Sequence, residues 1–85
     1  MCGDFSLFLL PLALVAKTQR KIIGEAVLRF RRKTGLSQEA LAEKADIHPN
    51  YVGRIERGEC SASVEILLKI AKALDIRPHK LFLKL

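Results

Sequence analysis

Apolar residues recur at helical spacing from Thr18 to the end of the chain, and no strand-like alternation of useful length occurs. The first such stretch places its apolar side chains on one helix face: Ile22, Ile23, Ala26, Val27 and Phe30. The pattern predicts a helix that begins with Thr18 as its N-cap and ends after Lys33, with Gly35 just beyond it. We therefore expect an all-α fold.

Two shorter helices are predicted next, separated by a tight bend. Ser37 is placed to cap the first of them. The second begins at Pro49, because the N–H that proline lacks has no intrahelical partner in a first turn, and Gly58 ends it. Asp46 and Ile47 leave too few residues for a loose loop, so the spacing predicts a helix-turn-helix.

Two further helices complete the predicted fold. Ser61 or Ser63 caps a fourth helix that runs through Leu74, and Pro78 opens a short fifth helix. The fifth helix carries more apolar surface than a small domain easily covers, in residues Leu81, Phe82, Leu83 and Leu85. We predict five helices in one bundle-like domain, with the last contributing to a homodimer.

The residues that precede this domain differ in character from the rest of the chain. Residues 5–16 form an apolar run that is interrupted by Pro11 and is short of the ~20 residues needed to cross a bilayer. We divide the chain into an apolar N-terminal extension, residues 1–16, and a helix-turn-helix domain, residues 17–85. Several alternatives stay open for the extension: packing on the domain or at a dimer interface, disorder, a weak membrane-surface role, or a start codon assigned too early.

Composition adds a preference for a polyanionic partner. Net charge is +6 and the isoelectric point is near 9.8, which favours nucleic acid or an anionic membrane. Cys2 and Cys60 are far apart and belong to no metal-binding motif, so we expect no metal and two free thiols in a reducing cytoplasm. His48 and His79 have no evident catalytic partners, so we expect no enzyme, cofactor or small-molecule ligand.

The predicted third helix presents a polar strip suited to duplex DNA. Asn50 and Arg54 are four residues apart and share one face. Asn can bridge N6 and N7 of adenine, and Arg can bridge O6 and N7 of guanine, with ~1–3 kcal/mol of discrimination for each good contact. Tyr51 neighbours them, and Arg57 and Gln38 crowd the same predicted surface. The alternative of a merely solvated helix face suits Asn50 better than Arg54.

Two supporting roles follow from position. Gln38 lies at the start of the second helix, where free N–H groups and the helix dipole favour an anion, so its amide can add a phosphate contact. Glu56 belongs near the inward edge of the third helix, and a carboxylate facing DNA would be repelled unless paired. We infer that Arg31 holds Glu56 in an ion pair, with a cost of ~3–5 kcal/mol for breaking one side.

Four stretches of the chain resemble the lambda-repressor-like, Xre/Cro-type helix-turn-helix family. They are Ile23-Gly24-Glu25 with Leu28-Arg29 and Arg31, Gly35-Leu36-Ser37-Gln38-Glu39-Ala40-Leu41-Ala42, Tyr51-Val52-Gly53-Arg54-Ile55-Glu56-Arg57-Gly58, and Leu67-Leu68-Lys69-Ile70-Ala71-Lys72-Ala73-Leu74. The resemblance covers residues 20 to 83. It implies a five-helix fold, a third helix that reads DNA, and a dimer on an operator with two half-sites.

The same resemblance implies roles for single residues by position. Gln38 falls at a phosphate or base contact, Arg31 with Glu56 at an internal ion pair, and the DNA-contacting positions are Pro49, Asn50, Tyr51 and Arg54. The chain departs from the family in two places: His48 stands where Ser, Thr or Asp commonly caps the helix, and Pro49 replaces a polar side chain.

Small chains of this family are stand-alone repressors, restriction–modification controller proteins or antitoxins. We therefore predict a cytoplasmic, dimeric regulator that reads a pseudo-palindromic operator in double-stranded DNA. The alternatives are an antitoxin, whose second partner would be a toxin protein, and a restriction–modification controller protein.

Overall fold

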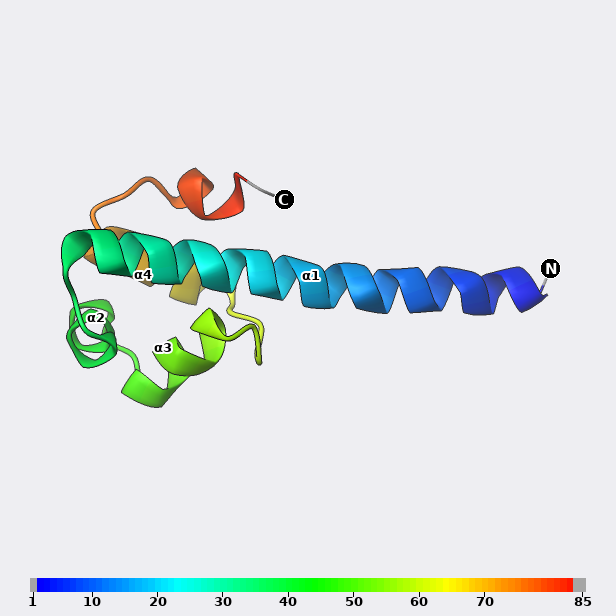
Figure 1. Ribbon diagram of the computed structural model, residues 1–85, viewed down its shortest axis with the longest axis horizontal. Helices are drawn as coiled ribbons and strands as arrows, with labels where there is room; N and C mark the ends of the chain where they lie inside the picture. The colour runs from blue at the N-terminus through cyan, green and yellow to red at the C-terminus, as the bar shows by residue number, and fades with distance from the viewer. Residues whose placement is uncertain (1, 84–85) are drawn as a thin grey trace.

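The computed structural model describes residues 2–83, with side chains from Thr18 onward. In this part of the chain, four α-helices are followed by one 3-10 helix: α1 (Cys2–Thr34), α2 (Gln38–Ala45), α3 (Pro49–Glu56), α4 (Val64–Ala73) and η1 (Pro78–Phe82). Figure 1 shows α2 and α3 on one side of α1 and η1 on the other. The all-α prediction is confirmed for the described residues, but the prediction of five α-helices is wrong.

The discrepancy lies in the last element. Pro78 opens it as expected, but it is a 3-10 helix of five residues. Its first turn is closed by the Lys80 amide, which donates to the Arg77 carbonyl over 3.0 Å, an i→i+3 bond. A segment this short gains little from the wider α-helical turn, whose bonds need one more residue to close.

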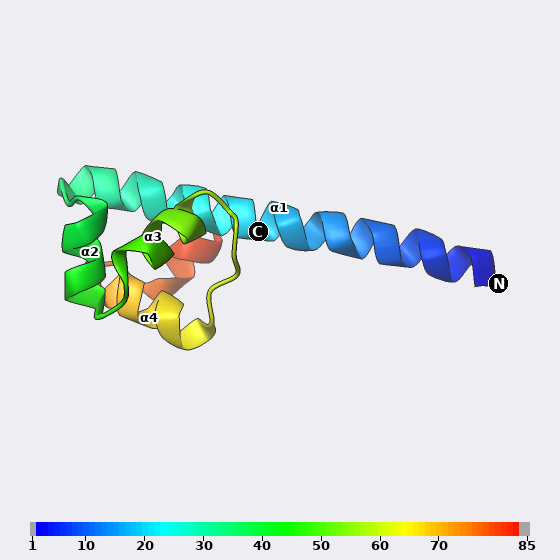
Figure 2. The same ribbon diagram turned by 90° about the horizontal axis from the view of Figure 1, so that it is seen from below.

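The first helix is longer than predicted. It begins at Cys2, and Thr18 lies inside it, so the predicted start at a Thr18 cap is wrong. The N-terminal half of α1 extends away from the other elements (Figures 1 and 2). At the other end, Gly35 has a φ of +74°, which glycine adopts without the strain of a Cβ atom. None of the helices in the described residues is long and apolar enough to cross a membrane.

Side-chain caps fix where the shorter helices begin. The Ser37 hydroxyl accepts a hydrogen bond from the Ala40 amide at 3.0 Å, and the Ser63 hydroxyl accepts one from the Ile66 amide at 3.2 Å. Each satisfies an amide that has no partner within the first helical turn. The cap of α4 is therefore Ser63 rather than Ser61.

All five elements contribute to one apolar core. Its members are buried side chains from the inward faces of the helices: Ala26, Val27, Leu41, Ala42, Ala45, Val52, Ile55, Leu67, Ile70, Ala71, Leu74 and Leu81. The apolar surface expected on the last helix is divided. Leu81 belongs to the core, Phe82 and Leu83 are exposed, and Leu85 lies outside the described residues.

Candidate nucleic-acid interface

A tight bend sets the position of α3 relative to α2. Asp46 ends α2 in the left-handed conformation, with φ 57°, and its amide donates to carbonyls in the last turn. The Ile47 amide then donates to the Ala42 carbonyl at 2.9 Å. His48 caps α3 directly afterwards: its Nδ1 accepts a hydrogen bond from the Asn50 amide at 3.1 Å. The bend is thus closed by its own hydrogen bonds, and histidine does the capping that Ser, Thr or Asp usually provides.

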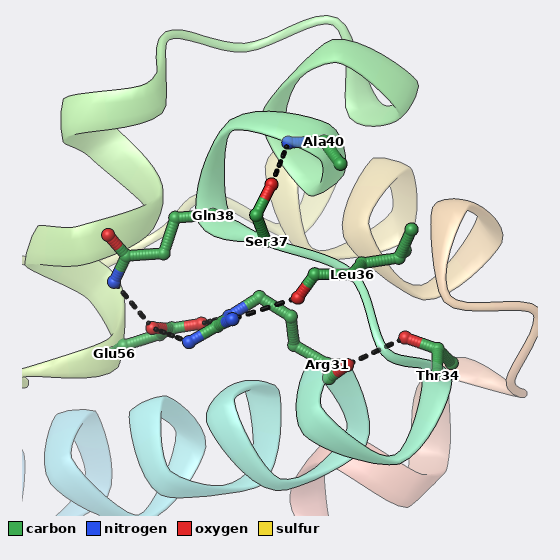
Figure 3. A network of polar contacts seen from close by, with 7 residues as sticks. All are labelled: Arg31, Thr34, Leu36, Ser37, Gln38, Ala40 and Glu56. Carbon is green, nitrogen blue, oxygen red and sulfur yellow. Dashed lines mark hydrogen bonds and ion pairs between the residues drawn. The ribbon is translucent and has the colours of Figure 1, made fainter.

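A buried carboxylate holds the inward side of α3. Glu56 Oε2 lies 2.6 Å from Arg31 Nε, and Glu56 Oε1 accepts from Arg31 Nη2 at 3.2 Å (Figure 3). The Glu56 side chain is only 3% exposed and that of Arg31 13%. Arg31 also donates through Nη1 to the Leu36 carbonyl at 2.9 Å. One guanidinium therefore ties α1 to α3 and to the turn before α2 through charge-assisted bonds.

Gln38 belongs to the same network. Its Nε2 donates to Glu56 Oε1 at 2.8 Å, so the carboxylate receives three hydrogen bonds in all (Figure 3). The side-chain amide that was expected to meet a phosphate or a base is thus already engaged within the protein. The backbone N–H groups at the start of α2 retain the geometry that favours an anion.

Most of the residues expected to meet DNA gather on one surface. They line a shallow pocket of about 250 Å³, made by Gln38, Pro49, Asn50, Gly53, Arg54 and Arg57. We call this set the polar face. Asn50 and Arg54 are both exposed, one helical turn apart on α3. Their amide and guanidinium groups are therefore free of the core and available to an outside partner.

Tyr51 lies apart from the polar face. It is half-buried against the core, and its hydroxyl donates to the Ser61 carbonyl at 3.3 Å. Consecutive helix positions point about 100° apart, so a residue next to Asn50 in sequence turns toward the segment between α3 and α4. Tyr51 here ties that segment to the helix.

Arg57 has a partner of its own at the edge of the polar face. Its Nη2 lies 3.0 Å from Glu59 Oε2, and both side chains are more than half exposed. The hydrogen bond from Arg57 holds the pKa of the Glu59 carboxyl below its usual range, and it raises the pKa of Arg57. Both groups therefore stay charged at neutral pH, and a phosphate that binds Arg57 has to compete with Glu59.

Two glycines support this surface, and the role of Gly24 was missed from the sequence. A Cβ at Gly24 would stand 2.2 Å from the Ile55 carbonyl oxygen, so only glycine lets α1 approach the end of α3 this closely. A Cβ at Gly53 would stand 3.0 Å from Arg57 Nη1 and 3.5 Å from Gln38 Oε1. The bare backbone there is covered by these two long side chains. For Gly24, its place inside a helix, where a glycine costs ~1 kcal/mol, was the available signal.

Known proteins are similar to this chain in sequence and fold. The family described as Helix-turn-helix (HTH_3) matches residues 27–81. The control protein C.BamHI of Bacillus amyloliquefaciens is 40% identical over 63 residues, which are 73% of this chain and 78% of that protein. The transcriptional regulator SinR of Bacillus subtilis is 34% identical over 61 residues, 71% of this chain and 55% of that protein.

A solved structure agrees with these matches. The restriction-modification controller protein C.AhdI from Aeromonas hydrophila superposes with a TM-score of 0.75 at 40% identity, and the match covers 76% of this chain and 98% of that one. The residues that the family matches, 27–81, include the bend, the polar face and the ion pair described above. The chain belongs to the helix-turn-helix family of DNA-binding transcription regulators.

Proposed function

We propose that this protein is a dimeric transcription regulator that reads a pseudo-palindromic DNA operator through α3. One observation carries the proposal: Asn50 and Arg54 are exposed one turn apart on a helix whose C-terminal end is anchored by the Arg31–Glu56–Gln38 network. Groups that discriminate base edges are useful only if their helix is held in one orientation. The same pair on a loosely held helix would not carry sequence information.

The polar face suits the major groove in its chemistry. Arg54 can donate two bonds to O6 and N7 of guanine, and Asn50 can bridge N6 and N7 of adenine. Pro49 offers only apolar contact. Arg57 can reach a phosphate after it releases Glu59, and the first amides of α2 face the backbone at a helix start. Base reading thus falls to two side chains, and the others set the register of the protein on the duplex.

Apolar side chains on α4 and beyond η1 support the dimer. Val64 is 71% exposed, Leu68 48% and Leu83 68%. Large apolar side chains that are left in water favour a contact with a second chain. In a two-fold dimer of this family's type the reading helices meet half-sites about one helical turn apart, ~34 Å. Since the operator is chromosomal or plasmid DNA, the proposal places the protein in the cytoplasm.

Selection of binding sites from a random duplex pool tests the function directly. We expect a short sequence with two related half-sites and a binding affinity that falls steeply with salt. At fixed salt, Arg54→Ala is expected to relax the preference at one base pair per half-site and to cost ~1–3 kcal/mol on the selected sequence.

Arg77→Ala is the matched control for that variant. Arg77 is an exposed arginine at the N-cap of η1, and η1 lies on the side of α1 away from α3 (Figure 1). The control loses the same charge and is expected to keep the base preference. If Arg54→Ala retained the wild-type preference, α3 would not be the reading element.

The relatives favour a narrower second candidate. C.BamHI is described as a control protein, and C.AhdI as a restriction-modification controller protein. We propose that this chain acts in the same way, on DNA next to genes for a restriction endonuclease and its methyltransferase. Footprinting of the DNA upstream of its own gene, in a genome that carries such a gene pair, tests the narrower role. Selected operators that lie only beside unrelated genes would contradict it.

A further inference from the structure

His48 caps α3 through Nδ1, and this cap determines which ring nitrogen carries the hydrogen. Nδ1 accepts the hydrogen bond of the Asn50 amide at 3.1 Å, and His48 has the extended backbone expected of an N-cap, with φ −72° and ψ 138°. A ring nitrogen accepts only when it carries no hydrogen. A neutral imidazole has one N–H, so in the capped state that N–H is at Nε2.

The cap also directs that N–H away from the helix. Nδ1 faces the first turn of α3, and Nε2 lies across the ring from the direction in which the cap bond is made. His48 is exposed, and Nε2 has no hydrogen-bond partner among the residues that the structure describes. The rigid ring thus holds a donor in one direction at the entry to α3, beside Pro49 and Asn50 of the polar face.

We propose that Nε2–H of His48 donates a hydrogen bond to a phosphate oxygen of the bound DNA; this inference rests on the proposed function. His48 lies in the bend between the end of α2 and the strip from Asn50 to Arg54. In the proposed function, this strip enters the groove. A donor at that place meets the rim of the groove, where phosphates are. Phosphate oxygens also receive half or more of protein–DNA hydrogen bonds.

This double role explains why histidine can replace the common caps at this position. A serine accepts from the amide equally well, but its only donor is the O–H of the same oxygen, which lies at the cap and not on the far side of a ring. Histidine joins an acceptor and a donor through one ring that has little freedom to lose. The bond to DNA therefore forms at small entropic cost.

His48→Ser separates the two functions, because serine keeps the cap and removes the donor at the position of Nε2, which the O–H of serine at the cap does not replace. Binding is measured at pH 8 and fixed salt, on the sequence selected from the random pool and on an unrelated duplex. We expect His48→Ser to bind both about two- to tenfold more weakly, as the loss of one neutral hydrogen bond allows. The salt dependence of binding should not change, because a neutral donor neutralises no phosphate charge.

Two further variants complete the test. His48→Ala loses the cap as well, so it should unfold at a lower temperature than His48→Ser and bind more weakly still. His79→Ser removes an exposed histidine from η1 and should bind as the wild type does. The ¹⁵N spectrum of the free protein at pH 8 should show His48 with an unprotonated Nδ1 and a protonated Nε2.

The outcomes distinguish this inference from the function on which it rests. If the wild type selects an operator and His48→Ser binds it equally well, the phosphate contact is overturned alone. A loss confined to one base pair would also overturn it, since a phosphate donor acts on every sequence alike. A protonated Nδ1 in the free protein would remove the premise of the capping geometry. If the wild type selects no sequence at all, the proposed function fails and the inference fails with it.

Discussion

Helices α3 and α4 bury similar residues and expose opposite chemistry. Inward, α3 contributes Val52 and Ile55 to the core, and α4 contributes a comparable apolar set. Outward, α3 presents Asn50 and Arg54, whereas α4 presents Val64 and Leu68 next to the charged Glu65 and Lys72. An exposed amide and guanidinium are stable in water and attract a polyanion, while exposed Val and Leu gain by leaving water. The outward faces, and not the core, therefore separate the helix proposed to bind DNA from a helix suited to contact with another protein chain.

The two helices also differ in how they are held. Among the residues that the structure describes, the inward face of α4 meets the core through apolar packing alone, and such packing is non-directional. The end of α3 is held additionally by a buried carboxylate with three hydrogen bonds and by a backbone contact across Gly24. Directional bonds limit rotation as well as distance. That difference suits a helix whose side chains must meet base edges in register.

Arg31→Ala is expected to have the largest effect on how α3 is held. It leaves the nearly buried Glu56 with Gln38 as its one remaining partner in the network, so we expect a loss of ~3–5 kcal/mol in the free energy of unfolding. For a domain of this size each kcal/mol lowers the melting temperature by ~4–8 °C. Urea unfolding followed by circular dichroism measures the change.

The double variant Arg31→Met, Glu56→Leu is the control. Replacing both charges by apolar groups removes the unpaired carboxylate, so most of the lost stability should return. DNA affinity should not return to the same extent, because the directional bonds are still absent. A double variant as unstable as Arg31→Ala would show that lost packing, and not the uncompensated charge, accounts for the effect.

Leu68→Ser addresses the outward face of α4. Leu68 is 48% exposed in one chain, so its loss should change the stability of the monomer little. If a second chain covers it, each copy loses up to ~1.5–3 kcal/mol of apolar burial and the dimer dissociates at higher concentration. Sedimentation equilibrium of wild type and variant measures the shift. Identical dissociation constants would place the dimer contact elsewhere.

Gly24→Ala tests the backbone contact behind α3. A methyl group 2.2 Å from a carbonyl oxygen forces α1 and α3 apart, which outweighs the ~1 kcal/mol gained in helix propensity. We expect a net loss of about 1–2 kcal/mol, again by urea unfolding. The matched control is Gly53→Ala. Its methyl group would meet the ends of flexible side chains, so the variant should be as stable as the wild type or more stable. An equal loss of stability in Gly53→Ala and Gly24→Ala would show that the backbone contact at Gly24 is not the cause.

Sequence reasoning succeeded where the cause of structure is local. The Ser37 cap, the start at Pro49 and the bend between them depend on residues within four positions of one another, and the structure has all three. It failed at Thr18, because a capping residue starts a helix only if the residues before it are not already helical. It also failed at η1, where five residues are too few for periodicity to distinguish a 3-10 helix from an α-helix.

The site shows the same limit. Asn50 and Arg54 could be placed on one face because helical spacing alone decides it. The partners of Gln38 and Tyr51 could not be read in this way. Gln38 bonds a residue 18 positions away, and Tyr51 bonds a carbonyl whose place depends on the path of the chain after α3. Such contacts follow from the tertiary arrangement, which no local pattern encodes.

Glu59→Gln is expected to have the smallest effect, and it tests whether Glu59 competes with DNA for Arg57. The substitution frees Arg57 and removes a negative charge near the proposed DNA, so affinity should rise modestly and its salt dependence should steepen by up to about one unit. Stability should not change measurably, because an exposed ion pair contributes little. Titrations of a fixed duplex at several salt concentrations measure both quantities.

The pKa of Glu59 determines the pH range over which wild type and Glu59→Gln differ in charge. Because Arg57 lowers it, any stability from the pair is present above the usual glutamate range of about 4 and is lost only as pH falls further. Wild type and variant therefore differ by one full charge throughout the neutral range. Glu25→Gln removes an equal charge from an exposed position on α1 and should raise affinity less. Equal gains in DNA affinity from both variants would show that Glu59 acts only through the net charge of the protein. Arg57 would then bind phosphate without competition from Glu59.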